Sequence, residues 1–138
     1  TRSTTETSFA MYLKSDYPNH PLKELLTDLK PSAYIKQTHE NYPKYYLLEV
    51  FYNLPPERLR QRIKKYLSFY ESSDWEIETG SSFPTILIIC PNNQVLIYLK
   101  KYLKAKLRML DDPDLMIYFS TTDQVKISGI TGDIWQSA

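Results

Sequence analysis

The spacing of apolar and polar positions predicts helices and strands along most of the chain. Leucines follow Pro21 at helical spacing and predict a short helix that Pro31 ends: Leu22, Leu25, Leu26 and Leu29. The segments Ala33–Gln37 and Tyr45–Tyr52 are rich in aromatic and β-branched residues and predict two strands. Because only the polar segment Thr38–Lys44 connects them, we expect the two strands to be antiparallel.

The second half of the chain predicts two long amphipathic helices and two strands. The helices run from Glu57 to Ser72 and from Asn92 to Leu110, with Asn92 as an N-cap. Phe83–Cys90 is almost continuously apolar, which is typical of a strand buried on both faces, and Leu115–Ser120 predicts a last strand. Two strands joined by a helix are expected to be parallel. The pattern therefore predicts an α/β protein with a central mixed sheet flanked by two long helices.

Three segments have weaker patterns. Residues 1–20 are predicted to be an N-terminal linker or frayed segment, and residues 21–138 to form one domain. Trp75–Glu78 is predicted to be a short strand. The tail, which contains Gly129, Gly132 and Trp135, is predicted to be a loop packed by its aromatic end.

Composition narrows the classes of function. The net charge of +1 argues against a generally basic surface, and three glycines leave no room for a dinucleotide-binding or Walker loop. A single cysteine, Cys90, excludes a disulfide framework and indicates a cytoplasmic protein. No apolar run approaches the roughly 18 residues of a membrane helix, so no membrane partner is expected.

The two long helices carry most of the seventeen lysines and arginines. Such a cationic surface can neutralise DNA phosphates. The alternative is that these side chains solvate the outer sides of two amphipathic helices. Six residues are the predicted phosphate contacts: Arg58, Arg62, Lys65, Lys100, Lys101 and Lys104.

The sequence gives little support for a metal site. His20 and His39 lack the spacing of a zinc site, and no Ser-His-Asp arrangement is recognisable. The carboxylates of Asp111, Asp112 and Asp114 could bind a hard cation, but this composition is more typical of a turn.

Glu49 is the most informative acidic residue because it lies in an apolar strand. A carboxylate is unfavourable there unless it is paired or binds a metal ion. A magnesium-dependent phosphodiesterase needs further acidic ligands, and neither Ser32 nor Phe51 provides one. Arg62, on the following helix, could pair with Glu49 instead.

Several segments together resemble the C-terminal domain of the replication-relaxation family, whose members belong to plasmids and integrative mobile elements. The resemblance spans about residues 30–135 and rests on these motifs: Pro31-Ser32-Ala33-Tyr34, Leu48-Glu49-Val50, Arg62-Ile63-Lys64-Lys65-Tyr66, Phe83-Pro84-Thr85-Ile86-Leu87-Ile88-Ile89, Ile117-Tyr118-Phe119-Ser120-Thr121-Thr122 and Gly132-Asp133-Ile134-Trp135. It implies a restriction-endonuclease-like fold of the PD-(D/E)xK type, with a DNA-binding winged helix commonly preceding it.

The same resemblance implies a degenerate catalytic site. Ser32 stands where the family pattern has aspartate, Phe51 where it has a second acid, and Arg62 where it has lysine. Only Glu49 and Tyr66 match the pattern. The resemblance thus implies a nuclease-like core that has lost most of its metal ligands, so neither a catalytic residue nor a cofactor is expected.

These observations favour a non-catalytic domain of a plasmid or mobile-element protein that acts in replication or DNA transfer. The domain would bind either DNA or a replication or transfer protein. One alternative is a Mg²⁺-dependent nuclease that uses Glu49 and a further acid such as Asp74 or Glu76. Another alternative is a protein-interaction or homodimerisation module that uses its tyrosine-rich surface.

Overall fold

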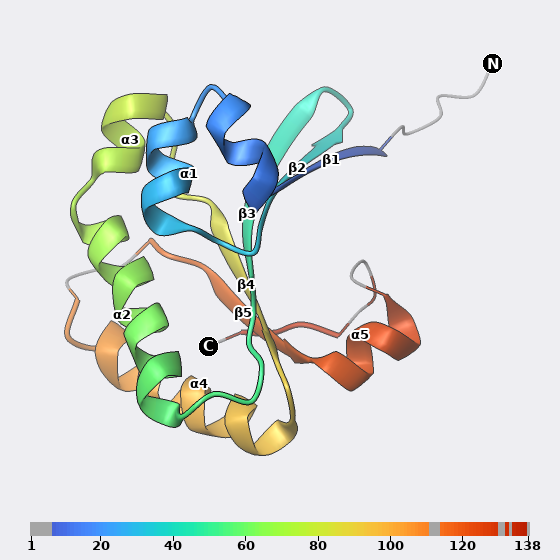
Figure 1. Ribbon diagram of the computed structural model, residues 1–138, viewed down its shortest axis with the longest axis vertical. Helices are drawn as coiled ribbons and strands as arrows, with labels where there is room; N and C mark the ends of the chain where they lie inside the picture. Colours follow the sequence, from blue (N-terminus) through green and yellow to red (C-terminus); the bar gives the residue numbers. More distant parts are fainter. Residues whose placement is uncertain (1–6, 111–113, 130–131, 133, 138) are drawn as a thin grey trace.

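A computed structural model describes residues 7–110, 114–129, 132 and 134–137. In this part of the chain, a mixed sheet in the order β1-β2-β3-β4-β5-β6 is accompanied by several helices (Figure 1). The elements in chain order are β1 (Thr7–Leu13), the 3₁₀ helix η1 (Lys14–Asn19), α1 (Lys23–Leu29), β2 (Ala33–His39), β3 (Tyr42–Val50), α2 (Pro56–Glu71), α3 (Asp74–Thr79), β4 (Thr85–Cys90), α4 (Asn93–Leu107), β5 (Ile117–Thr121), α5 (Thr122–Ser128) and β6 (Gln136–Ser137).

Strand directions agree with the sequence-based predictions. β2 and β3 are antiparallel, whereas β4 is parallel to both β3 and β5, so the β4-α4-β5 crossover is confirmed. The β2–β3 connection is shorter than predicted, because only Glu40 and Asn41 lie outside the ladder. Both residues have positive φ, as a tight two-residue hairpin turn requires. The α/β class with a mixed sheet is therefore confirmed.

The two faces of the sheet are covered unequally (Figure 1). The helices α1, α2, α3 and α4 pack on one face, which we call the helix-covered face, and form the main core with residues such as Leu47, Ile86 and Phe119. The opposite face, which we call the open face, has a smaller cluster that includes Ile35 and Leu87. Of the helices formed by the described residues, only α5 lies on this side.

The two long helices form as the apolar stripes predict. In α2, Leu59, Ile63, Tyr66 and Leu67 are buried, and α4 buries Leu96, Leu99 and Leu103. The Asn92 side chain accepts a hydrogen bond of 2.9 Å from the backbone N–H of Val95, which confirms the predicted N-cap. No helix in the described ranges has the length and apolar composition needed to cross a membrane.

Residues 7–20 contradict the prediction of a linker or frayed end over residues 1–20. Thr7–Leu13 forms β1, which pairs with β2 along its whole length. η1 follows, and its Tyr17 is buried and donates a hydrogen bond of 2.8 Å to the carbonyl oxygen of Pro31. The folded domain therefore includes this segment, while residues 1–6 lie outside the described part.

Two further predictions are wrong. Trp75–Glu78 belongs to the helix α3 rather than to a strand, and its flanking residues Ser73 and Gly80 are both left-handed. The tail is not simply a loop, because α5 and β6 occupy most of its described residues. Its aromatic end does pack on the sheet, as predicted, since Trp135 joins the open-face cluster.

Candidate functional site

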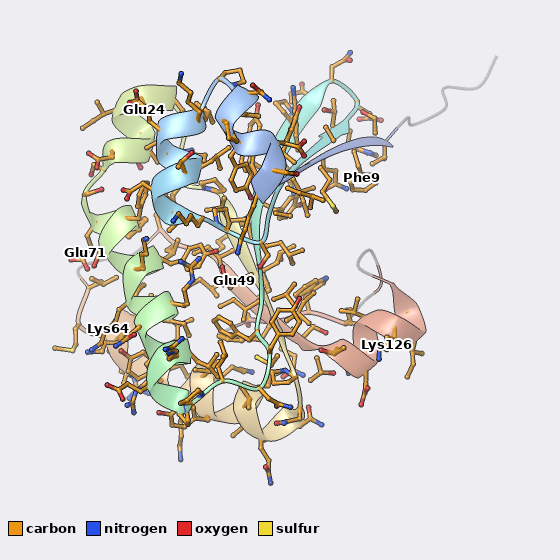
Figure 2. The ribbon with its side chains drawn as sticks, viewed as in Figure 1. Phe9, Glu24, Glu49, Lys64, Glu71 and Lys126 are labelled. Carbon is orange, nitrogen blue, oxygen red and sulfur yellow. The ribbon has the colours of Figure 1, made fainter. Side chains whose placement is uncertain are left out.

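Glu49 lies on β3 and faces the helix-covered side of the sheet. Its neighbours in the parallel ladder are apolar, and it is opposite Ile88 of β4. Only 8% of the residue is exposed, so its carboxylate is withdrawn from most solvent. Figure 2 places Glu49 between the sheet and α2. An acid in such a position needs partners close by.

α2 supplies those partners. Arg62 donates from Nη2 to Glu49 Oε1 at 2.7 Å and from Nε to Oε2 at 3.1 Å, forming a two-pronged ion pair. The phenol of Tyr66, one turn further along the helix, donates to Oε1 at 2.6 Å. Both carboxylate oxygens of Glu49 therefore have protein donors. The pairing of Glu49 with Arg62, which the sequence left as one possibility, is confirmed.

Arg62 also ties α1 to this site. Its Nη1 donates to the carbonyl oxygen of Leu29 at 3.0 Å, and its Nη2 donates to that of Lys30 at 3.1 Å. These carbonyls lie at the C-terminal end of α1, where the last turn of a helix leaves acceptors without intrahelical donors. One guanidinium thus joins α1, α2 and β3.

The pKa values of the two donors follow from this environment. Burial by itself lowers the pKa of Arg62, but the hydrogen bonds and negative charge of Glu49 reverse this effect and raise it above its usual value. Burial and then the charge of Glu49 raise the pKa of Tyr66 well above its usual value. Arg62 therefore stays cationic and Tyr66 stays a neutral donor across the physiological range.

Ser32 lies beside β3 and makes a hydrogen bond to its backbone rather than to the Glu49 side chain. Its Oγ accepts a hydrogen bond of 3.0 Å from the backbone N–H of Val50, the residue after Glu49. The structure thus brings together Ser32, Glu49, Arg62 and Tyr66, the four positions that the sequence singled out. Phe51 is buried in the main core, and its backbone N–H donates to the carbonyl oxygen of Ile89. It serves packing.

The remaining candidate ligands do not assemble into a metal site. Within the described ranges there is no group of three or more histidine, cysteine or acidic residues placed to hold a metal ion. Asp74 and Glu76 are exposed on α3. Asp111 and Asp112 lie outside the described residues, so the predicted cation site there stays a prediction.

The two histidines have local partners. His39 is hydrogen bonded through Nδ1 to the hydroxyl of Thr7 at 2.7 Å, which links β1 to β2. His20 accepts at Nδ1 from the backbone N–H of Leu22 and packs edge-on against the ring of Tyr12. Both histidines therefore serve the N-terminal part of the fold.

The six predicted phosphate contacts are spread over two helices and differ in their availability. Arg62 is committed to Glu49 and to the end of α1. Lys100 donates a hydrogen bond to Gln136 of β6 at 3.4 Å. Arg60, a basic residue of α2 outside the predicted set, donates a hydrogen bond to Tyr98 of α4 at 2.7 Å. The other predicted contacts are exposed or partly exposed: Arg58, Lys65, Lys101 and Lys104. The structure does not gather all six at one point.

Sequence reasoning missed a hollow of about 970 Å³ on the open face of the sheet. Phe9 and Met11 of β1 line it together with Ile35, Tyr46 and Trp135. The alternation of Phe9, Met11 and Leu13 was the signal in the sequence, because a period of two indicates a strand with one apolar side.

The class that the fold defines is an α/β protein with a six-stranded mixed sheet among its described residues. Comparison with known proteins found no matching family model, no matching curated protein and no matching solved structure.

Proposed function

We propose that this chain is a non-catalytic DNA-binding domain from a replication or DNA-transfer protein of a plasmid or mobile element. The observation that carries the non-catalytic part is the pairing of Glu49 with Arg62 and Tyr66. Arg62 and Tyr66 occupy both carboxylate oxygens at 2.6–3.1 Å. A magnesium ion at Glu49 would have to compete with these donors and would lie beside the fixed positive charge of Arg62.

The positions around Glu49 support descent from a PD-(D/E)xK nuclease. Ser32 and Arg62 adjoin Glu49 at the places where the resemblance expects an acidic ligand and a catalytic lysine. An arginine in place of that lysine forms a bidentate pair with a carboxylate, which a lysine cannot do. The substitutions together convert a metal-binding position into an internal ion pair. The plasmid or mobile-element setting rests on the resemblance alone.

α4 provides the best surface for phosphate contacts. Between Asn93 and Leu107 it carries four lysines and no acidic residue. Lys101 and Lys104 are exposed, and their spacing of three places them side by side on the helix. Arg58 of α2 is also exposed, whereas Arg62 is held by Glu49 and the end of α1. Cations so placed would bind the DNA backbone irrespective of base sequence.

The test is DNA binding measured by fluorescence anisotropy at a series of salt concentrations. Replacing Lys101 and Lys104 together by alanine should weaken binding and reduce the slope of log K against log salt by about 2, since each lost phosphate contact contributes about 0.9. The matched control replaces Lys23 and Lys126, exposed lysines on α1 and α5, and should leave the slope unchanged. Absent binding, salt-independent binding, or an equal effect of both pairs would contradict the proposal.

A second arm tests the absence of catalysis. Supercoiled plasmid incubated with the wild-type protein and Mg²⁺ or Mn²⁺ should remain intact. Metal-stimulated nicking that Glu49→Gln abolishes would instead establish the nuclease alternative.

A further inference from the structure

β1 is an edge strand with little of the usual protection against pairing: only at its last residue is the edge capped, where the carboxylate of Asp16 accepts a hydrogen bond of 2.8 Å from the backbone N–H of Leu13. In the described part of the chain it pairs only with β2, and its outer side lies at the rim of the sheet (Figure 1). Its seven residues, Thr-Ser-Phe-Ala-Met-Tyr-Leu, include no charge and no proline. Natural edge strands are commonly guarded by charged residues, proline or bulges, because their free N–H and C=O groups accept another strand.

The side chains of β1 extend an apolar surface to this edge. Phe9, Met11 and Leu13 are 54%, 50% and 49% exposed. Met11 is opposite Ile35 in the antiparallel ladder, so it lies on the open face with the cluster that contains Ile35. Phe9 and Met11 also form part of the hollow on that face. A strand added to the edge would thus gain hydrogen bonds and apolar contacts together.

We infer that the partner at this edge is β1 of a second copy of this chain, paired antiparallel about a two-fold axis at Ala10. This register places Phe9 opposite Met11 of the second copy, and Ala10 opposite its own equivalent. Phe9 and Met11 share a face, so each axis-related pair brings a thioether against an aromatic ring, which is a favourable contact. The two sheets become one continuous sheet through an isologous interface.

The composition of β1 favours a second copy over a segment of another protein. An uncharged strand offers no electrostatic selection for a charged peptide and does not repel a second copy of itself, and the axis at Ala10 sets the exposed Phe9 and Met11 of the two copies against each other. The inference does not depend on DNA binding, because neither α2 nor α4 contributes to this edge.

The first test is sedimentation velocity on the full chain over a wide range of protein concentration. The wild-type protein should dimerise. Met11→Lys introduces two charges at the paired edges and should raise the dissociation constant about 100-fold, which is about 2.8 kcal/mol. Met109→Lys is the matched control, because Met109 is 79% exposed and lies beyond α4, and it should leave the dimer intact.

The second test is disulfide trapping, which reports the register. Ala10→Cys places two thiols opposite each other across the axis, within the Cα separation that a disulfide spans, and mild oxidation should yield a covalent dimer. Ser68→Cys, on the exposed side of α2, should give little covalent dimer. The native Cys90 is buried and should not form intermolecular disulfides.

The outcomes of these two tests decide the inference. A protein that stays monomeric at every concentration would overturn it and would leave the edge to a strand from another protein. A dimer that survives Met11→Lys unchanged, or one that Ser68→Cys traps and Ala10→Cys does not, would place the interface elsewhere and would equally overturn it.

Discussion

Removing the guanidinium of Arg62 should destabilise the fold more than any surface substitution on α2. Arg62→Met keeps much of the aliphatic stem but removes both hydrogen bonds from Arg62 to Glu49 and both donors to the end of α1. The carboxylate of Glu49, whose side chain is only 10% exposed, would then keep Tyr66 as its remaining donor. The perturbation therefore leaves a largely buried charge without its counterion.

The size of the effect can be bracketed from these contacts. Breaking a buried ion pair by removing one partner costs about 3–5 kcal/mol, and the 25% exposure of the Arg62 side chain argues for the lower end, about 3 kcal/mol. For a domain of this length, about 3 kcal/mol corresponds to a fall in Tm of roughly 10 °C. Arg58→Met removes an exposed arginine one turn away and should change stability by less than about 0.5 kcal/mol.

The assay is urea unfolding of the wild type, Arg62→Met, Glu49→Gln and the double variant, combined in a double-mutant cycle. Glu49→Gln removes the charge that Arg62 compensates, so the double variant should be less destabilised than the sum of the singles by about 2 kcal/mol. A cost below about 1 kcal/mol for Arg62→Met, or a coupling energy near zero, would refute the view that Glu49 and Arg62 form a structural pair.

Three further predictions concern single contacts. Ser32→Ala removes the acceptor of a β3 backbone N–H and should cost about 1–2 kcal/mol in urea unfolding, whereas Ser68→Ala on an exposed helix surface should cost little. Asn92→Ala removes the N-cap of α4 and should lower the unfolding free energy by about 1 kcal/mol, with Asn93→Ala as the control. Burial raises the pKa of the Cys90 thiol to about 12, so a thiol reagent at pH 8 should label the folded protein far more slowly than the urea-unfolded protein; equal rates would contradict this burial.

The sign of the Cys90 effect on stability follows from the same shift. The folded-state pKa is raised above the unfolded value near 9, so the contribution of the buried thiol is fully present below pH 9. It should decline as the pH rises from 9 towards 12, by at most about 1.4 kcal/mol per pH unit. Cys90→Ala should reduce the loss of stability over that range, measured as the urea midpoint at successive pH values.

The elements predicted correctly are those whose pattern of apolar and polar residues is long or is bounded by clear helix- or strand-breaking residues. The apolar stripe of α2 and the continuous apolar run of β4 each admit one interpretation. Trp75–Glu78 does not, because four residues with Trp75 and Ile77 alternating fit a strand as well as one turn of helix. In a strand, Trp75 and Ile77 would share a face; in α3, Trp75 is buried and Ile77 is 76% exposed. The left-handed residues that bound α3, Ser73 and Gly80, have no unambiguous signal in the sequence.

β1 was missed for a different reason. Its strand state depends on pairing with β2, whose residues lie 20 to 32 positions later in the chain, and its polar flank resembles a chain end. The ion pair of Glu49, by contrast, was one of the alternatives in the sequence, because a carboxylate among apolar strand residues requires a partner and Arg62 lies on the next helix. The hydrogen bonds from Arg62 to Leu29 and Lys30 could not, since they depend on where α1 ends in space.

The contacts of Arg62 also explain why metal binding and the present fold compete for one carboxylate. To coordinate an ion, Glu49 would have to release the donors at 2.6 and 2.7 Å, and the freed guanidinium would be repelled by the incoming cation. Movement of Arg62 away from that charge would also remove its hydrogen bonds to the end of α1. An ion would therefore have to offset the loss of contacts among α1, α2 and β3 as well as its own dehydration. Introducing an acid at Ser32 alone would leave that competition in place, because Arg62 and Tyr66 would still hold Glu49.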